Sequence, residues 1–302
     1  NNRVLIFSGE NWHGGVIGIV AARLVQKYGK PCLVISDDGE NAKGSARSID
    51  GFSLYDAISS AAELLTHYGG HVLAAGFSLK SENLDKFRVA IEQYAKKVEM
   101  PFPVLEIDLR LRPEFVSADL LEEINSLEPF GAGNPQPVFG LYGMTLSSVQ
   151  PIGGGKHLRL TVRKGDCSHT ALLFSTTAEE FPYRTGDVLD LAVKLERNEY
   201  MGQVRVSIYV KDIRMSGTDD DKYLKSVRLY EKIKRGDRIT ERQAQFALSQ
   251  RDFFANVYRF IKENGGWQYS TDILCYRLGD DGSNACKVLI CIEVLCELGV
   301  FR

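Results

Sequence analysis

The stretch Tyr68-Gly69-Gly70-His71-Val72-Leu73-Ala74-Ala75-Gly76-Phe77 carries very little side-chain bulk. Glycine tolerates positive φ and exposes its backbone N–H, so such a run allows a sharp bend and the close approach of a second molecule. A helix that begins near Val72 would direct the N–H groups of Gly70 and His71 at a bound group such as phosphate. The alternative is a tight turn in which the alanines let a helix pack closely against a sheet. The stretch alone leaves both interpretations open.

Three further motifs accompany this stretch. Residues 9–23 read Gly-Glu-Asn-Trp-His-Gly-Gly-Val-Ile-Gly-Ile-Val-Ala-Ala-Arg, and residues 43–48 read Lys-Gly-Ser-Ala-Arg-Ser. Residues 127–137 read Leu-Glu-Pro-Phe-Gly-Ala-Gly-Asn-Pro-Gln-Pro. With the Gly-Gly-His run, the first two resemble the DHHA1 domain of the DHH phosphoesterase superfamily. The third resembles a signature of RecJ-like single-strand-specific exonucleases, and all four motifs occur in that family's order.

The spacing of Ser45 and Arg47 places both side chains on one side of an extended backbone. A hydroxyl and a guanidinium on one face can hold a phosphate, although spacing alone fits an ordinary surface arginine equally well. The resemblance implies that this pair binds the 5′-terminal phosphate of DNA and that the Gly-Gly-His run contacts the strand near the scissile bond. The expected substrate-binding residues are Ser45, Arg47, Gly69, Gly70, His71, Ala75, Gly76 and His13.

The two histidines in this set also have structural interpretations. His71 could be a core histidine that donates to a carbonyl, whereas in the family it faces the cleft and contacts the substrate. His13 precedes a helix start, which is an anion site, but a buried Trp12 beside a structural His13 fits nearly as well.

The sequence contains no Asp-His-His or Asp-His-Asp motif. In the superfamily this motif and further aspartates bind two Mn²⁺ or Mg²⁺ ions, and none of the five histidines here has carboxylates at metal-ligand spacing. We therefore expect no catalytic residue, no metal and no cofactor in this chain. The metal ions of the intact enzyme would lie in an absent DHH lobe. The chain begins at Asn1 and is expected to be the C-terminal part of a longer protein, inactive by itself.

Bulk composition narrows the protein class. The chain has 302 residues, 44% of them hydrophobic and 25% charged, which is typical of a soluble protein of two or three domains. No apolar run is long enough to span a membrane, and no signal peptide opens the chain. Six cysteines without a Cys-x-x-Cys pair argue against zinc and for free thiols in the cytoplasm. A net charge of −2 means that nucleic-acid binding requires a local basic surface.

Hydrophobic patterns predict a multidomain fold that combines α/β and β architecture. Residues 1–100 alternate strands with helices and form the expected α/β DHHA1 domain, with helices at residues 16–28, 54–68 and 84–98. Residues 101–216 are expected to form an OB-type β-barrel, with strands at residues 138–149, 157–163, 169–174, 188–197 and 203–214. Residues 217–302 are expected to form a small helical, winged-helix-like domain.

The barrel supplies a second set of candidates. OB-folds bind single strands with a basic groove and stacking aromatics. The candidates are Lys156, His157, Arg159, Arg163, Arg197, Tyr200 and Arg205, of which residues 197–200 are expected in a loop. Exposed arginines occur on any β domain, so no single member of this set is decisive. Phe130 could stack on a base, but an aromatic between Pro129 and Gly131 more often plugs an interface.

We therefore expect the substrate-binding portion of a RecJ-like 5′→3′ single-stranded-DNA exonuclease that acts in DNA repair and recombination. One alternative is a phosphodiesterase for short oligonucleotides or cyclic dinucleotides. Another is a non-catalytic module that binds single-stranded DNA and uses residues 217–302 to recruit a partner such as single-strand-binding protein. The basic run from Lys225 to Arg238 fits such a contact or a solvated helix face.

Overall fold

The computed structural model describes residues 3–102, 104–131, 133–200, 203–280 and 284–301. The chain divides into two compact units, Asn1–Leu105 and Glu106–Arg302. The boundaries expected at residues 100 and 216 stay a prediction. Within the described residues, no helix is long and apolar enough to cross a membrane.

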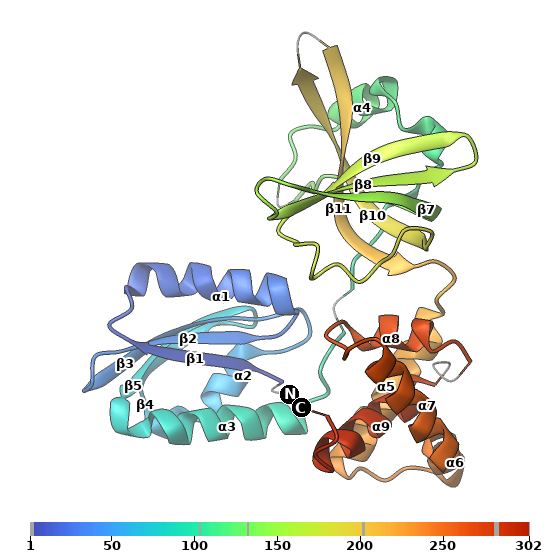
Figure 1. The fold of residues 1–302 in the computed structure, drawn as a ribbon. Coiled ribbons are helices and arrows are strands. Elements are labelled where there is room, and N and C mark those ends of the chain that lie inside the picture. Colours follow the sequence, from blue (N-terminus) through green and yellow to red (C-terminus); the bar gives the residue numbers. More distant parts are fainter. Residues whose placement is uncertain (1–2, 103, 132, 201–202, 281–283, 302) are drawn as a thin grey trace. The chain divides into compact units, whose positions relative to one another are not determined.

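The first unit contains a mixed sheet with the strand order β1-β2-β3-β5-β4 (Figure 1). Only β1 and β2 are parallel, and the other neighbours pair antiparallel. The strands are β1 (Leu5–Glu10), β2 (Cys32–Asp37), β3 (Asn41–Arg47), β5 (Ala74–Lys80) and β4 (Leu65–His71).

Helices cover both faces of this sheet (Figure 1). Helix α1 (Gly14–Tyr28) connects the two parallel strands, as such a pair requires, and buries Ile17 and Ala21 against Cys32 and Val34. Helices α2 (Leu54–Ser59) and α3 (Leu84–Lys97) pack on the opposite face. That face holds the larger apolar core of the unit, which includes Phe52, Ile58, Phe77, Phe87 and Ile91.

The structure rules out one of the two interpretations left open for the glycine-rich stretch, and it contradicts the bounds of one expected helix. No helix begins near Val72, because β4 and β5 form an antiparallel hairpin whose turn contains Val72 and Leu73. The helix expected over residues 54–68 ends at Ser59, and after a short 3₁₀ turn the chain enters β4. Pairing with β5 supplies backbone hydrogen bonds that override the local helical pattern.

The second unit begins with a closed β-barrel. Strand β10 pairs with both β11 and β7, which closes the ring β7-β8-β9-β11-β10. The strands are β6 (Leu109–Arg110), β7 (Phe139–Ile152), β8 (His157–Lys164), β9 (Cys167–Leu173), β10 (Val188–Tyr200) and β11 (Gln203–Met215). Residues 197–200, expected in a loop, instead extend β10.

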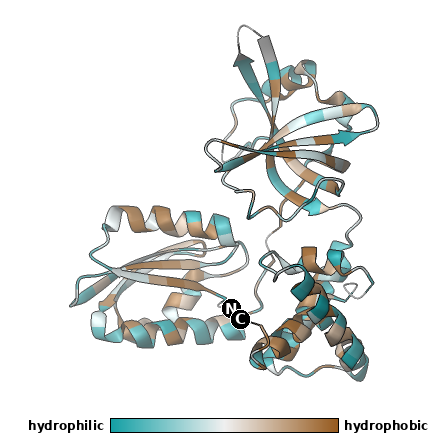
Figure 2. Ribbon diagram, viewed as in Figure 1, coloured by the Kyte–Doolittle hydropathy of each residue, from teal (hydrophilic) through white to brown (hydrophobic). Residues whose placement is uncertain are grey.

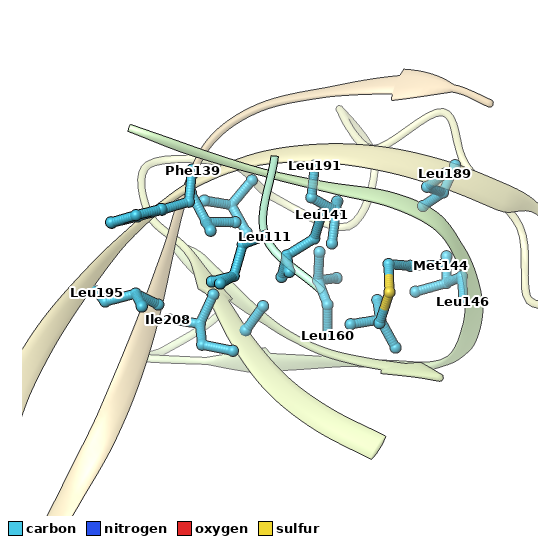
Figure 3. Close-up of a cluster of buried hydrophobic side chains, with 14 of the residues drawn as sticks. Leu111, Phe139, Leu141, Met144, Leu146, Leu160, Leu189, Leu191, Leu195 and Ile208 are labelled. Atoms are coloured by element: carbon cyan, nitrogen blue, oxygen red, sulfur yellow. The ribbon is translucent and has the colours of Figure 1, made fainter. Parts of the chain in front are cut away.

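Hydrophobic and hydrophilic residues alternate along these strands (Figure 2). Because successive side chains of a strand point to opposite faces, this alternation gives the barrel an apolar interior and a polar exterior. The interior is filled by large aliphatic side chains from several strands, including Leu141, Leu146, Leu160, Leu191 and Ile208 (Figure 3). The barrel is thus a packed core, and any ligand must bind to its outer surface.

The Pro-Phe-Gly motif forms an ordered turn after helix α4 (Ala118–Asn125). Phe130 packs against the barrel core, and the amide of Asn134 donates to the carbonyl oxygens of Leu127 and Pro129. These contacts give Phe130 a structural role, the one favoured for it from sequence.

The remainder of the second unit is helical. Its helices are α5 (Asp220–Arg235), α6 (Glu241–Ala247), α7 (Arg251–Glu263), α8 (Thr271–Arg277) and α9 (Ala285–Glu297). The described residues between 217 and 301 contain no strand, so they show no β wing. Part of the basic run is structural, since Lys234 of α5 binds Glu293 of α9 at 2.7 Å.

Three cysteines of this helical part are buried. Burial raises the pKa of the Cys275 and Cys291 thiols to about 12 and that of Cys286 to about 11. Such thiols are protonated and behave as small apolar side chains.

An ion pair links the helical part to the barrel. Arg277 of α8 donates through both terminal nitrogens to Asp187, which lies just before β10, and the Nη1–Oδ1 distance is 2.8 Å. Both side chains are largely buried. Burial alone would raise the pKa of Asp187, but the hydrogen bonds from Arg277 and from the Arg184 amide hold that pKa below its ordinary value.

Replacing Asp187 by Asn should lower the free energy of unfolding of the second unit by about 3 kcal/mol, because Arg277 then remains buried without its carboxylate. A carboxylate with a lowered folded-state pKa stabilises the fold above its unfolded pKa, about 3.9, and loses that effect as the pH falls through the folded value. Urea unfolding followed by circular dichroism, near neutral pH and at about pH 3, measures both effects.

The matched control is Glu122→Gln, which removes the exposed partner of Arg197 at 3.5 Å. This variant should lose less than about 1 kcal/mol. Equal losses for the Asp187 and Glu122 variants would contradict a special role for the buried pair.

Candidate functional site

The register of β3, β5 and β4 brings the residues of two sequence motifs into adjacent rows on one sheet face. Ser45 pairs with Gly76, and Gly76 pairs with Gly69. In the next row Arg47 pairs with Ala74, and Ala74 pairs with His71. These rows lie on the face that α1 covers in part, because the alternate residues Ala46, Ala75 and Phe77 fill the core on the other face.

Ser45 and Arg47 contact each other and lie close to α1. The Arg47 guanidinium donates from Nη1 to the Ser45 hydroxyl at 3.3 Å and to the Ala46 carbonyl at 2.8 Å. Gly18 of α1 faces both side chains, since a Cβ at this position would lie 3.0 Å from Ser45 Oγ and 3.2 Å from Arg47 Nη2. The absence of a side chain at Gly18 thus lets the helix pack beside a hydroxyl and a positive charge, a pair suited to an anion.

Gly69 and Gly76 form a bare strip of backbone beside this pair. Both are exposed. A Cβ at Gly69 would meet nothing within 4 Å, and one at Gly76 would meet only the Gly44 carbonyl oxygen at 3.9 Å. Packing therefore does not demand glycine at either position. The consequence is an open floor that a second molecule can approach down to the backbone.

Gly70 and Ala75 serve the hairpin itself. Gly70 has a φ of 146°, and a Cβ there would overlap the Ala74 carbonyl oxygen. Ala75 is buried in the core of the opposite face, so its side chain does not belong to the open face. Of the stretch chosen from sequence, Gly69, His71 and Gly76 are thus the members exposed on the face shared with Ser45 and Arg47.

Each histidine of the first set is exposed and bonded locally. Nδ1 of His13 accepts from the Gly15 amide at 3.1 Å, so this side chain caps the N-terminus of α1. Nδ1 of His71 accepts from the Leu73 amide at 3.3 Å, which ties the ring to the hairpin turn. The core interpretation of His71 does not fit its exposure.

The barrel candidates lie on three strands and the turn before β8. His157, Arg159 and Arg163 lie on the outer face of β8, and Lys156 lies in the turn before it. Arg197 forms an ion pair with Glu122 of α4. Arg205 is exposed on β11, and the side chain of Tyr200 lies outside the described part of the chain. A role in DNA binding stays a prediction for every member of the set.

Sequence reasoning missed two aromatic residues on the outer barrel surface. Phe174 stacks on Tyr209 with ring centroids 5.5 Å apart, and His157 packs edge-on against Phe174 at 4.8 Å. Phe174 follows β9 and Tyr209 lies in β11, so no local motif connects them. The available signal was the alternation of β11, which predicts an outward Tyr209 between the buried Ile208 and Val210.

The described residues contain no group of three His, Cys, Asp or Glu side chains arranged to hold a metal ion. The histidine and aspartate ligands that the resemblance implies for Mn²⁺ or Mg²⁺ are not found together among the described residues. No chemical step through a metal is assigned to this chain.

Two family models match the chain. Residues 1–97 match the DHHA1 domain, and residues 107–212 match the RecJ OB domain. The DHHA1 part contains the paired residues around Ser45 and Arg47, and the OB part contains the barrel. The chain therefore combines a DHHA1 domain with an OB domain of the RecJ type.

Two curated relatives are similar to this chain over about two thirds of its length. The chain is 32% identical over 218 residues to the single-stranded-DNA-specific exonuclease RecJ of Bacillus subtilis, a match that covers 70% of this chain and 28% of that protein. RecJ of Thermus thermophilus is 31% identical over 209 residues, covering 67% of this chain and 28% of that protein. By these matches the chain is RecJ-like, and it spans well under half the length of the relatives.

A solved structure agrees with these matches. The crystal structure of Thermus thermophilus RecJ in complex with Mg²⁺ superposes with a TM-score of 0.60 at 27% identity, covering 72% of this chain and 33% of that one. A second structure of the same protein contains Mn²⁺ and gives the same TM-score. The expected fold class, α/β together with an OB-type barrel and helices, is confirmed.

The adjacent glycines Gly69 and Gly70 should respond differently to substitution. Gly70→Ala should lower the free energy of unfolding by about 1–3 kcal/mol, because it combines a positive φ with a backbone overlap. Gly69→Ala should change it by less than about 0.5 kcal/mol, since the new methyl group points into open space. Urea unfolding of both variants compares them, and equal losses would contradict the described hairpin geometry.

Proposed function

We propose that this chain is the portion of a RecJ-like exonuclease that binds single-stranded DNA and receives its 5′ end. The observation that carries the proposal is the adjacency of Ser45 and Arg47 to the open glycine strip of Gly69 and Gly76. A terminal phosphate bound by the pair would leave the following backbone above the strip. Such contacts select a strand by its phosphates and its accessible backbone rather than by its sequence.

Electrostatics support this assignment at the local level. The whole chain has a net charge of −2 and does not attract DNA by its total charge. The Arg47 guanidinium is half-buried between strand and helix, where a charge-assisted hydrogen bond to phosphate is stronger than in open water. A site that holds the 5′ phosphate would impose a 5′→3′ direction, because the strand could enter in only one sense.

Hydrolysis would need groups that this chain lacks. Its sequence has no Asp-His-His motif, and the Thermus thermophilus RecJ structures are complexes with Mg²⁺ and Mn²⁺. We propose that the intact enzyme uses such divalent ions through residues outside this chain, and that the chain alone is inactive. Mn²⁺-dependent nuclease activity that co-purifies with the chain through every separation step would contradict this.

A binding and recruiting module is the second candidate function. The closed barrel with exposed aromatic and basic side chains is an arrangement that OB-folds use for single strands. For the isolated chain this function differs from the first because it places the DNA contacts on the barrel rather than at Ser45 and Arg47. A partner such as single-strand-binding protein on residues 217–302, a role in repair and recombination, and a cytoplasmic location stay predictions.

Fluorescence anisotropy of this chain with oligo-dT, with and without a 5′ phosphate, tests the first proposal. The 5′ phosphate should raise the affinity about tenfold at low salt, and the gain should shrink as salt rises. Arg47→Gln should abolish this gain. Gly69→Val should weaken binding of both strands, because its side chain would stand on the strip where the backbone must approach.

The matched control is Arg23→Gln, which removes an equal charge from the exposed surface of α1. This variant should keep the 5′-phosphate preference. Salt-sensitive binding that ignores the 5′ phosphate would contradict the phosphate site at Ser45 and Arg47 and leave the barrel as the DNA contact. Absence of binding would contradict the proposed function as a whole.

A further inference from the structure

A second row of polar side chains borders the glycine strip, on the side away from Arg47. Lys43 of β3 pairs with Ser78 of β5, and Ser78 pairs with His67 of β4. Each of the three lies two residues along its strand from the row that contains Ser45 and the glycine strip, so their side chains share its face of the sheet. The two rows are ~7 Å apart, since a strand rises ~3.4 Å per residue. The open strip therefore has polar side chains along both of its long sides.

A β-bulge in β4 puts His67 on this face. The pairing with β5 advances by two residues on β4, from Leu65 to His67, while it advances by one on β5, so Thr66 is the extra residue. Without the extra residue, His67 would pair with Phe77 and point into the apolar core. Bulges that re-aim a side chain in this way are common beside functional sites.

The polar groups of this second row are not used within the fold. None of the three side chains forms a hydrogen bond or an ion pair with another described residue, and Lys43 is exposed. Lys80, one row farther along, differs because it binds Glu40 at 3.1 Å. Backbone hydrogen bonds from Asn41 and Glu40 lower the pKa of Asp38, and Lys43 adds a smaller Coulombic effect. That carboxylate is held by its own turn, so the ammonium of Lys43 is available to an anion from outside the chain.

We propose that Lys43, Ser78 and His67 form a subsite for the first internucleotide phosphate of a strand whose 5′ phosphate is bound at Ser45 and Arg47. This inference rests on the proposed function, to which it adds a second anionic position and the residues that hold it. An ammonium, a hydroxyl and an imidazole can each donate a hydrogen bond to a phosphate oxygen, and the ammonium also supplies a positive charge. A strand above the strip has its first two phosphates fixed, whereas a mononucleotide with one phosphate fills a single position. The subsite thus distinguishes the end of a strand from a free nucleotide.

A 5′-phosphorylated oligo-dT whose first linkage is a neutral methylphosphonate tests the subsite, because it keeps every base and the 5′ phosphate and loses one charge. In fluorescence anisotropy at low salt, the wild-type chain should bind this strand about tenfold more weakly than the all-phosphate strand. Lys43→Gln should bind both strands equally, since the ammonium that recognises the charge is gone. His67→Ala should reduce the difference to about threefold, because one donor to the phosphate is lost while the charge of Lys43 remains.

The matched control is Lys80→Gln, which removes an equal charge one row farther along, where Glu40 already pairs with it. This variant should keep the full difference between the two strands. Two results would overturn the subsite and leave the proposed function standing, provided that the 5′-phosphate preference is intact: equal binding of both strands by the wild-type chain, or a Lys43→Gln variant that keeps the difference. A wild-type chain without any 5′-phosphate preference would overturn the proposed function itself, and the subsite with it.

Discussion

The ring of Phe77 on β5 occupies the space that Gly44 leaves open on β3, and this contact fixes the register of the two strands. A Cβ at Gly44 would overlap the ring, and the two residues pair directly across the sheet. A slip of one residue would turn every side chain of β3 to the opposite face and carry Ser45 and Arg47 into the apolar core. The chemistry of the open face therefore depends on a packing contact beneath it.

The period of a β-strand explains why part of this site could be predicted from sequence. Ser45 and Arg47 are two residues apart, so an extended backbone was enough to place them together. The hairpin was not predictable in the same way. Gly69 and Gly70 contribute no hydrophobic signal, while Ala57, Ile58, Ala61, Leu64 and Leu65 continue a helical pattern into the first residue of β4. Pairing with β5 decides the structure there, and that pairing is a tertiary interaction.

In the barrel, too, the sequence pattern predicted the strands but not which side chains contact one another. Strand spacing and turn residues predicted a closed barrel, because alternation reports burial directly. They could not tell which basic residue has a neighbour of opposite charge, as Arg197 has in Glu122. Nor could they predict the contact between Phe174 and Tyr209. That contact depends on a short parallel pairing of β9 with β11, in which only Ala171 pairs with Ile208 and Leu172 with Tyr209. Contacts between distant strands are where sequence patterns carry the least information.

Binding of a phosphate by Arg47 and stacking of a base on the exposed aromatic side chains of the barrel would depend on salt in different ways, and this difference bears on how the chain retains a strand. Phosphate binding at Arg47 weakens as counterions compete for the phosphate, whereas base stacking loses little when charges are screened. Because the chain has a net charge of −2, long-range attraction contributes little and each contact must act at short range. Stacking therefore carries a growing share of the binding free energy as salt rises. A strand without bases would lose that share, while a strand without a 5′ phosphate would keep it.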